Sequence, residues 1–392
     1  MAELLSLDQA IALVLERARP LPAEPVGVEA AAGRVLAEPA AAAVDLPPFP
    51  SSAMDGFAVR SADLPASLPV ADRIAAGKPA ARPLAPGEAM AIATGGVVPE
   101  GADAVVPIEV VVEADNRVEF SQSVVPGDNV RPRGGDVRAG ETVVSAGTRL
   151  GAAHIGALAA AGVATVSCTR RPAAAIVATG SELRPPGTLL EPGEIYEANG
   201  QLLGAALASA HADVASLTTV ADDAAAHRAA LEDALRHDVV LSSGGVSVGP
   251  HDLVRSVERE LGVEEVFWRV AVKPGKPVSF ATRGETLVFG LPGNPVSVLV
   301  GFELFVRPAL RALEGEADPG PRWEDGRLAR AVRRNGARDE LVRAKRTPDG
   351  FEPLGGQESH MIVRSASADA LVLVPRGEGE LAAGASVRWL PL

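Results

Sequence analysis

The sequence has little cysteine, with Cys168 as the only thiol among 392 residues. One thiol excludes an intrachain disulfide and any zinc or iron–sulfur site built from cysteines, and it is typical of a reducing compartment. The N-terminus has no basic stretch followed by an apolar core and a cleavage site, and no apolar run reaches the roughly 20 residues that span a bilayer. We therefore expect a cytoplasmic protein with no membrane anchor.

The sequence also lacks an excess of positive charge. Its 37 basic and 50 acidic side chains give a formal net charge of −13, which repels nucleic acid and anionic membrane surfaces. We expect no nucleic-acid partner, and an anionic ligand would need a locally basic pocket. The motifs G-x-x-x-x-G-K-[ST], G-x-G-x-x-G after a strand, and H-E-x-x-H are absent too, which disfavours an ATPase, a dinucleotide-dependent enzyme and a zinc protease.

Length and composition predict several folded domains. The chain is roughly two to three times the usual domain length, and its contents of 47% apolar and 22% charged residues are typical of a globular protein. Ser6 and Gln9 form a capping box ahead of Leu7, Ile11 and Val14, which predicts an N-terminal amphipathic helix. Short β-branched runs cut by Pro-Gly and Gly-Gly turns predict a mostly β domain from about residue 55 to 150.

Beyond Pro172 the pattern changes to strands alternating with helices, which predicts a parallel, doubly wound α/β sheet. The expected strands are 173–178, 214–220, 238–241, 266–272, 278–281 and 286–290, and the expected helices are 200–210, 224–236, 253–261 and 295–313. Residues 314–327 have no apolar periodicity and are expected to be a linker, and residues 328–392 have the strand-and-turn character of a small β domain.

Unusual loops follow the predicted strands of this α/β domain. Ligands of an open parallel sheet bind beyond the carboxyl ends of its strands, so these loops are the candidate site. The candidate binding residues are Thr179, Gly180, Ser181, Ser243, Gly244, Gly245, Val246, Ser247, Gly249, Pro292, Asn294 and Pro295. Glycine lets backbone N–H groups approach a phosphate, but such a loop is an ordinary tight connection about as often.

Glu182, Asp222 and Asp252 would supply hard oxygen ligands for a magnesium ion that also touches substrate phosphate. The alternative for Asp222 is a helix cap, and we hold the two interpretations equally, whereas Glu182 has no comparable structural reason. Lys273 and Lys276 are spaced to grip an oxyanion on a proline-stiffened loop. A solvated turn is the alternative for the lysines.

The segments SAMDGFAV, ATGGVVPEGADAVV, RPRGGDVRAGE, ATGSEL, SSGGVSVGPHD, VAVKPGKP and GLPGNPVSV together resemble the molybdopterin molybdenumtransferase family. The match runs in order from about residue 1 to 313, and the tail is similar through Arg338, Arg343, Ser359 and His360. The resemblance implies an enzyme that inserts molybdate into adenylylated molybdopterin, releases AMP and uses Mg²⁺. The protein would contribute positioning and electrostatics rather than a covalent nucleophile.

The resemblance also implies an elongated homodimer of four-domain subunits, in which the inserted β domain of one subunit closes the site of the other. The expected domains are an N-terminal linker domain (1–45 plus 138–170, with residues 1–45 packing on a helix at 151–162), an inserted mostly β domain (46–137), a molybdopterin-binding α/β domain (171–313) and a C-terminal β domain (327–392). Transient contacts with a molybdopterin adenylyltransferase and with molybdoenzymes are further expectations.

By the same resemblance, family positions fall on both the inserted and the α/β domains. Asp55, Glu182, Asp222, Asp252, Lys273 and Lys276 are the expected catalytic residues, Thr94, Arg131, Asp136, Arg338 and Ser359 join the binding set, and Pro292 and Pro295 match a loop proposed to hold molybdate. The chain departs from common family forms at Tyr196–Asn199 and at Pro132. Two other functions remain open: adenylylation of molybdopterin, which would consume ATP, and a dimeric scaffold that binds receptor peptides.

Overall fold

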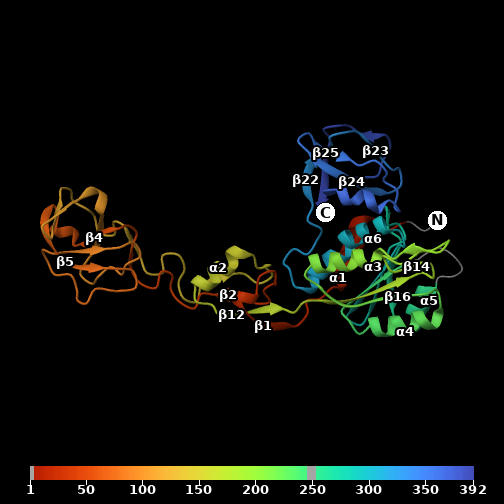
Figure 1. Ribbon diagram of the computed structural model, residues 1–392, viewed down its shortest axis with the longest axis horizontal. Helices are drawn as coiled ribbons and strands as arrows, with labels where there is room; N and C mark the ends of the chain where they lie inside the picture. Colours follow the sequence, from red (N-terminus) through yellow and green to blue (C-terminus); the bar gives the residue numbers. More distant parts are fainter. Residues whose placement is uncertain (1–3, 245–252) are drawn as a thin grey trace.

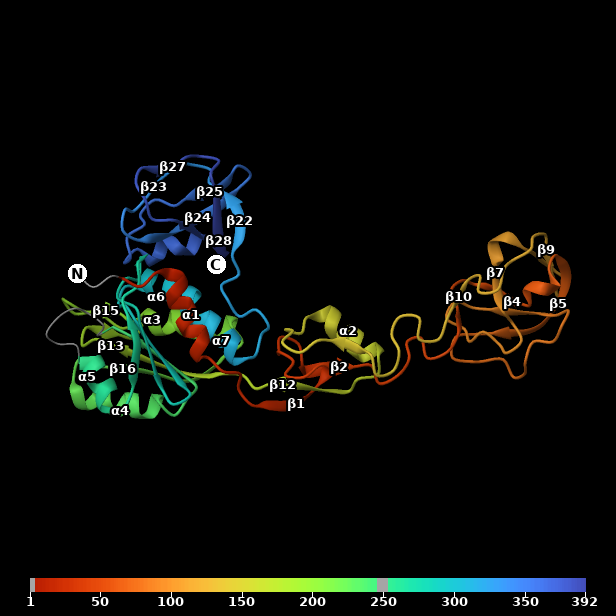
Figure 2. The same cartoon turned by 180° about the vertical axis from the view of Figure 1, so that it is seen from behind.

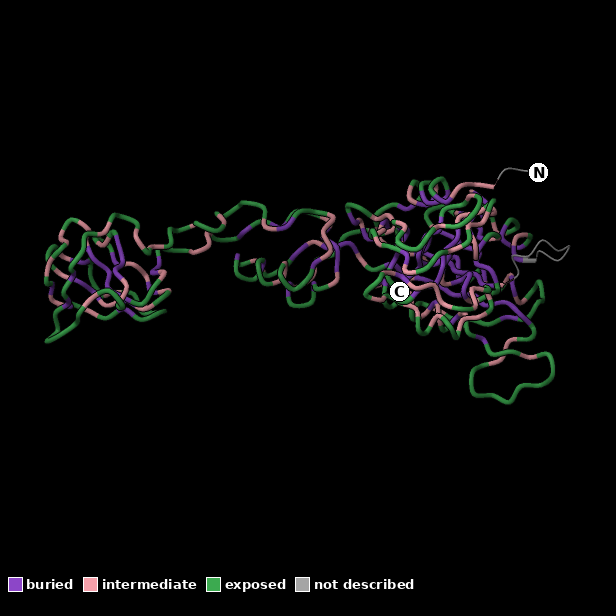
Figure 3. The backbone as a smooth tube through the Cα atoms, turned by 90° about the horizontal axis from the view of Figure 1, so that it is seen from above, coloured by how far each residue is buried: buried purple, intermediate pink, exposed green. Residues whose placement is uncertain are grey.

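The computed structural model describes residues 4–244 and 253–392 of the chain. The molecule is elongated, with an all-β unit at one end, a small middle unit, and the α/β and C-terminal units side by side at the other end (Figure 1). Buried segments gather separately within these units (Figure 3). Of the predicted site residues, Gly245, Val246, Ser247, Gly249 and Asp252 lie outside the described residues.

A six-stranded sheet forms the centre of the α/β unit. Its order is β16 (Asp213–Val220), β13 (Ala173–Thr179), β17 (Val239–Ser243), β21 (Thr286–Leu291), β20 (Ser279–Arg283) and β18 (Glu264–Trp268). The first four strands are parallel, but β20 and β18 are antiparallel to their neighbours. The expectation of a parallel sheet is therefore wrong for β20, which runs against the other five strands, because the β20–β21 connection through Gly284 is too short for a parallel crossover.

Helices cover both faces of this sheet, as the doubly wound pattern predicts (Figure 2). One face carries α1 (Leu7–Arg17), α3 (Asn199–Ser209), α6 (Pro295–Gly301) and α7 (Arg307–Leu313), and the other carries α4 (Ala224–Ala234) and α5 (Leu253–Glu260). Ile176 and Val177 of β13 point into opposite cores, which is why this strand has a continuous apolar run. The helix expected over 295–313 contains a π-helical stretch at Phe302–Val306.

Helix α1 has the predicted capping box: the Gln9 backbone N–H donates to Ser6 Oγ at 3.3 Å, and the Ser6 N–H donates to Gln9 Oε1 at 3.1 Å. Its buried residues, among them Ile11 and Val14, pack into the core of the α/β unit. The expectation that all of residues 1–45 pack with residues 151–162 is therefore wrong for α1. Helical periodicity identifies an apolar face but does not say which unit will bury it.

The middle unit has its own small core, which includes Leu36, Leu158 and Cys168. Its elements are β1 (Ala23–Gly27) paired with β12 (Thr165–Thr169), β2 (Ala40–Ala41) paired with β11 (Thr142–Val144), the 3₁₀ turn η1 (Val28–Ala30) and α2 (Ala152–Ala160). Segments that precede and follow the distal unit in the sequence therefore meet in the middle unit. The chain leaves the middle unit, forms the distal unit and then returns.

The distal unit is a six-stranded sheet ordered β7 (Ala104–Pro107), β4 (Gly56–Val59), β6 (Ala89–Ile92), β5 (Ala66–Ile74), β9 (Arg117–Phe120) and β8 (Val112–Ala114). A small pair, β3 (Ser51–Ser52) with β10 (Val130–Arg131), and the turns η2 (Ser61–Asp63) and η3 (Ile108–Val110) complete it. The β content expected here is confirmed.

The C-terminal unit is a sheet ordered β19 (Val272–Lys273), β24 (Asp339–Thr347), β26 (Ala370–Val374), β28 (Ser386–Pro391) and β22 (Glu324–Arg327), with β25 (Gly350–Pro353) beside β24. The pair β23 (Val332–Arg333) and β27 (Glu380–Leu381) and the turn η5 (Ile362–Ser367) complete it. The strand expected over 266–272 is thus divided between two sheets, and β19 joins the α/β unit to the C-terminal unit. No helix among the described residues is long and apolar enough to cross a membrane.

Candidate active site

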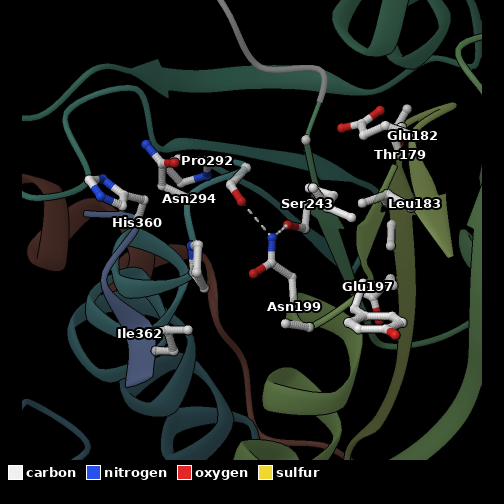
Figure 4. Close-up of a pocket in the computed structure, with 18 of the residues that line it drawn as sticks. Thr179, Glu182, Leu183, Glu197, Asn199, Ser243, Pro292, Asn294, His360 and Ile362 are labelled. Carbon is white, nitrogen blue, oxygen red and sulfur yellow. Dashed lines mark hydrogen bonds between the residues drawn. The ribbon is translucent and has the colours of Figure 1, made fainter. Parts of the chain in front are cut away.

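A cavity of about 650 Å³ opens at the carboxyl ends of β13, β17 and β21 (Figure 4). Nine of the predicted residues line it: Thr179, Gly180, Glu182, Asp222, Ser243, Gly244, Pro292, Asn294 and Pro295. Loops that are up to 116 residues apart in the chain therefore meet at one place, since parallel strands end at the same edge of a sheet. The cavity is large enough for a ligand of drug size or above.

Two carboxylates, those of Glu182 and Asp222, reach this cavity from neighbouring loops. Asp222 Oδ2 accepts a hydrogen bond from the Ser181 N–H at 3.2 Å, and the Asp222 N–H donates to Ser181 Oγ at 3.0 Å. The helix-cap alternative for Asp222 is wrong, because the N-cap of α4 is Asp223, whose Oδ1 accepts from the Ala226 N–H at 2.8 Å. The Asp222 carboxylate is thus left for the loop and the cavity.

Gly244 is required by the backbone at the end of β17. Its φ is +92°, and a Cβ added there would lie 2.4 Å from the Thr179 carbonyl oxygen. The glycine therefore serves close packing of the β13 and β17 ends, and it also lets that backbone edge face the cavity. The tight-connection interpretation of this loop therefore applies at Gly244, and the phosphate-binding interpretation stays a prediction.

Asn199 joins three loops at the floor of the cavity and was not predicted as a site residue. Its Nδ2 donates to Ser243 Oγ at 2.9 Å and to the Gly293 carbonyl at 2.8 Å (Figure 4). Beside it, Glu197 is only 5% exposed and accepts from the Gly200 N–H at 2.7 Å. Asn199 and Glu197 lie at the start of a helix after a short strand, and this position could have marked them as site residues. From the sequence, this segment was recognised only as a departure from common family forms.

The short strands β14 (Leu183–Arg184) and β15 (Ile195–Tyr196) form one wall of the cavity. Leu183, Ile195 and Tyr196 give this wall an apolar and aromatic surface, which suits a flat ring system better than a phosphate. This wall was not predicted from the sequence, because two-residue strands show no periodicity.

The C-terminal unit contributes the opposite wall through His360 and Ile362. Predicted Ser359 lies next to them: its Oγ accepts from Asn294 Nδ2 at 2.9 Å, and its carbonyl accepts from the Val296 N–H at 3.1 Å. Arg338 does not line the cavity among the described residues, and its N–H donates to Asn335 Oδ1 at 3.0 Å.

The two predicted lysines do not line the cavity in the part of the chain that the structure describes. Lys273 Nζ forms an ion pair with Glu340 of β24 at 2.9 Å, and Lys276 is exposed. The expected grip of both ammonium groups on one anion is therefore not formed here. Lys273 instead ties the α/β unit to the C-terminal unit.

The predicted residues of the distal unit lie at the other end of the molecule (Figure 1). Asp55 Oδ1 accepts from the Thr94 N–H at 2.7 Å and from Thr94 Oγ1 at 3.0 Å, and these hydrogen bonds hold the pKa of the Asp55 carboxyl below its ordinary value. Arg131 is on β10, and Arg131 and Asp136 are both exposed. A single chain does not bring this group to its own cavity.

Comparison with known proteins agrees with this architecture. The family profiles "MoeA N-terminal region (domain I and II)", "Probable molybdopterin binding domain" and "MoeA C-terminal region (domain IV)" match residues 5–162, 175–312 and 325–392. The chain is 36% identical to molybdopterin molybdenumtransferase 2 of Mycobacterium tuberculosis, over 97% of each chain. It is 33% identical to the molybdopterin molybdenumtransferase of Haemophilus influenzae, over 99% of this chain and 98% of that one.

A solved structure has the same arrangement over the whole length. The molybdopterin biosynthesis moeA protein of Pyrococcus horikoshii superposes with a TM-score of 0.86 at 26% identity, and all of both chains is covered. Identity above 30% over nearly full length, together with this shared fold, is enough to assign the family. The chain belongs to the molybdopterin molybdenumtransferase family, a family of transferases in molybdenum cofactor biosynthesis.

Proposed function

We propose that this enzyme inserts molybdenum from molybdate into adenylylated molybdopterin and releases AMP. The observation that carries the proposal is the cavity of about 650 Å³ in a chain of this family. Strand-end loops, two carboxylates and a wall from the C-terminal unit meet in this cavity. Such a cavity can hold a flat ring system and its phosphates together.

The two sides of the cavity differ in chemistry, and this difference supports a separate place for each part of the substrate. Leu183, Ile195 and Tyr196 offer an apolar surface for a ring. Thr179, Ser243 and the backbone around Gly244 offer polar groups for phosphate oxygens. The substrate would lie across the strand ends with its phosphoanhydride above the polar loops.

A magnesium ion would be held by Glu182 and Asp222, together with substrate oxygens and water. The donor set fits, since carboxylate oxygens are the ligands that Mg²⁺ prefers and few of its ligands need come from protein. The described residues contain no group of three or more His, Cys, Asp or Glu side chains that could hold a metal, and Asp252 lies outside them. When bound, the ion would offset charge on the phosphate. The chain's own part is to hold both carboxylates at the cavity edge.

Molybdate would bind where Pro292, Asn294 and Pro295 meet Ser359 and His360. The Ser359 hydroxyl accepts from Asn294, so its own proton is available to an oxyanion. Lys273 and Lys276 lie on the loop ahead of Pro277, which lines the cavity. Lys273 would have to exchange Glu340 for the anion, an ion pair that is weak while partly exposed.

The distal residues Asp55, Thr94, Arg131 and Asp136 would act on the cavity of a second copy in a homodimer. The supporting observation is their position at the far end of an elongated chain (Figure 1). Because contacts across a two-fold axis are reciprocal, two such chains would form two equivalent shared sites.

The test is AMP release by the purified enzyme from adenylylated molybdopterin, followed by chromatography with and without molybdate. Glu182→Ala is expected to lower the rate by about tenfold or more, because the magnesium ion that would offset the phosphate charge would lose one of its protein ligands. Glu285→Ala is the matched control, since Glu285 is an exposed carboxylate at the opposite edge of the same sheet. Release that is independent of molybdate, or equal rates for both variants, would overturn the proposal.

A further inference from the structure

Arg343 on β24 is a charged side chain in an unusual place. It is 0% exposed, and it lies in the C-terminal unit behind the cavity wall rather than in it. Burying a guanidinium costs free energy unless its donors are satisfied, and here burial lowers the pKa of Arg343. Because burial of this guanidinium costs free energy, we expect Arg343 to have a specific role.

The guanidinium donates to one short segment of chain. Nη1 reaches the Met361 carbonyl at 2.5 Å and Ser365 Oγ at 3.2 Å, and Nη2 reaches the carbonyls of Gly356 at 2.7 Å and Glu358 at 3.3 Å. A planar guanidinium holds five N–H donors in fixed directions and can gather several carbonyls at once, whereas an ammonium group has only three donors on a compact charge. Residues 356–365 are therefore folded around this one side chain.

Gln357 fastens the same segment to the Arg343 backbone. Its Oε1 accepts from the Arg343 N–H at 3.0 Å, and its Nε2 donates to the Arg343 carbonyl at 2.9 Å. The segment is thus held from inside by the guanidinium and from the strand edge by the amide. Both sets of hydrogen bonds are made by Arg343, one by its side chain and one by its backbone.

The held segment is the part of the C-terminal unit that reaches the cavity. Ser359 bonds to Asn294 and Val296, and His360 and Ile362 line the wall. Arg343 is therefore linked to the cavity through the carbonyls of 356–361 and then through Ser359 to the Asn294 loop. Arg343 itself does not line the cavity among the described residues.

We propose that Arg343 is a positioning residue, which holds residues 356–362 so that Ser359 and His360 face an oxyanion at the Asn294 end of the cavity. The identity of that oxyanion as molybdate rests on the proposed function, but the positioning does not. Loss of the fork should loosen this wall and leave the β14–β15 wall, where the ring would bind, in place.

The first test is amide hydrogen exchange on the full-length protein, which needs no substrate. In Arg343→Lys, exchange across 356–362 and at the Val296 N–H is expected to rise by about tenfold or more, while β26 and β28 stay protected. Arg346→Lys is the matched control: it is the same change on the same strand, at an exposed guanidinium that lies over Trp389. If β26 also loses protection in Arg343→Lys, the C-terminal unit has unfolded in that variant. Gln357→Ala, which keeps the buried charge, must then raise exchange across 356–362 while β26 and β28 stay protected.

The second test separates positioning from general damage. In Arg343→Lys the KM for molybdate is expected to rise by about tenfold, with the KM for adenylylated molybdopterin changed by less than about twofold. Unchanged exchange across 356–362 in both variants would overturn the proposal, and so would an equal loss for both substrates. If the wild type shows no molybdate-dependent AMP release, the proposed function fails, and the exchange result still decides the role of Arg343.

Discussion

Asp222 and Asp223 are neighbours in the sequence, but their carboxylates have different partners. Asp223 caps α4 through the Ala226 N–H, whereas Asp222 bonds to the Ser181 loop at the cavity. The sequence placed an aspartate at a strand end and so predicted a site there, but it could not say which of two adjacent aspartates caps the helix. That choice depends on where the helix begins to within one residue.

The adjacent pair makes a sharp test at the scale of one residue. Asp223→Ala should lower the free energy of unfolding by about 0.5–2 kcal/mol, because α4 loses its cap, and should leave AMP release unchanged. Asp222→Asn should do the reverse, with turnover reduced and stability kept. Denaturant unfolding and rate measurements on both variants check this. The same loss of turnover in both would contradict the division of roles.

His227 is a buried residue for which the structure predicts an effect of pH on stability. It is 1% exposed, and burial lowers its pKa, although nearby Asp222 acts in the other direction. Below the ordinary histidine pKa of 6.5 the unfolded chain takes up a proton that the folded protein resists, so the free energy of unfolding falls as pH falls. Above that pH the contribution is constant.

The substitution His227→Leu should therefore reduce the loss of stability between pH 7.5 and pH 5.5, measured by denaturant unfolding. Leu231→Ala, on the same buried face of α4, is the control because it removes apolar contacts without changing a titratable group. It should lower stability equally at both pH values. A pH dependence unchanged by His227→Leu would show that the folded protein binds the imidazole proton as readily as the unfolded chain, and would contradict the lowered pKa.

At the scale of elements, the sequence predicted most helices and strands of the α/β unit but not the reversed direction of β20. Alternating apolar residues mark a strand without saying which way it runs. The short turn at Arg283–Glu285 did carry that information, because only an antiparallel pair fits so few residues. The β14–β15 wall was missed, and the 356–362 wall was predicted only at Ser359 through the family resemblance. Both walls are short or irregular segments without periodicity, and the second is placed by contacts such as those of Arg343.

The joint between the middle and α/β units depends on Arg149. It forms ion pairs with Glu314 at 2.5 Å and Glu316 at 2.6 Å, and Nη1 donates to the Gly33 carbonyl at 2.6 Å. Arg149→Met would leave the Glu314 carboxylate buried without this cation, while Glu316 keeps Arg322. We expect a cost of about 3–5 kcal/mol in the free energy of unfolding, measured with denaturant.

A surface pair gives the comparison for that variant. Arg133 and Asp45 form an ion pair in which the arginine is 66% exposed. Arg133→Met should cost less than about 1 kcal/mol, because exposed pairs are screened by water. Similar values for the two variants would mean that the joint is not held by Arg149.

At the scale of the whole molecule, the chain carries its two groups of candidate residues at opposite ends. The sequence alone predicted both groups through the family resemblance, but no periodicity or spacing indicated that one subunit keeps them apart. The elongated shape comes from separate cores, because the distal sheet and the α/β sheet each bury their own apolar residues. A shared site then follows only if a second copy supplies the distal group.

Mixed dimers test the shared site. Asp55→Ala and Glu182→Ala should each lower the rate by about tenfold or more as homodimers, since each damages both sites of the dimer. A heterodimer purified through two different tags would keep one intact site and should recover about half of the wild-type rate. No recovery in the heterodimer would contradict a site built from two subunits.

If metal insertion is coupled to AMP release, the two products must form in a fixed ratio within a single turnover. Enzyme loaded with adenylylated molybdopterin is mixed with molybdate, AMP is quantified by chromatography, and molybdenum bound to the recovered pterin is measured by mass spectrometry. We expect about one molybdenum incorporated for each AMP released, and neither product when molybdate is omitted. AMP without incorporated molybdenum, or consumption of ATP in place of AMP release, would contradict this coupling.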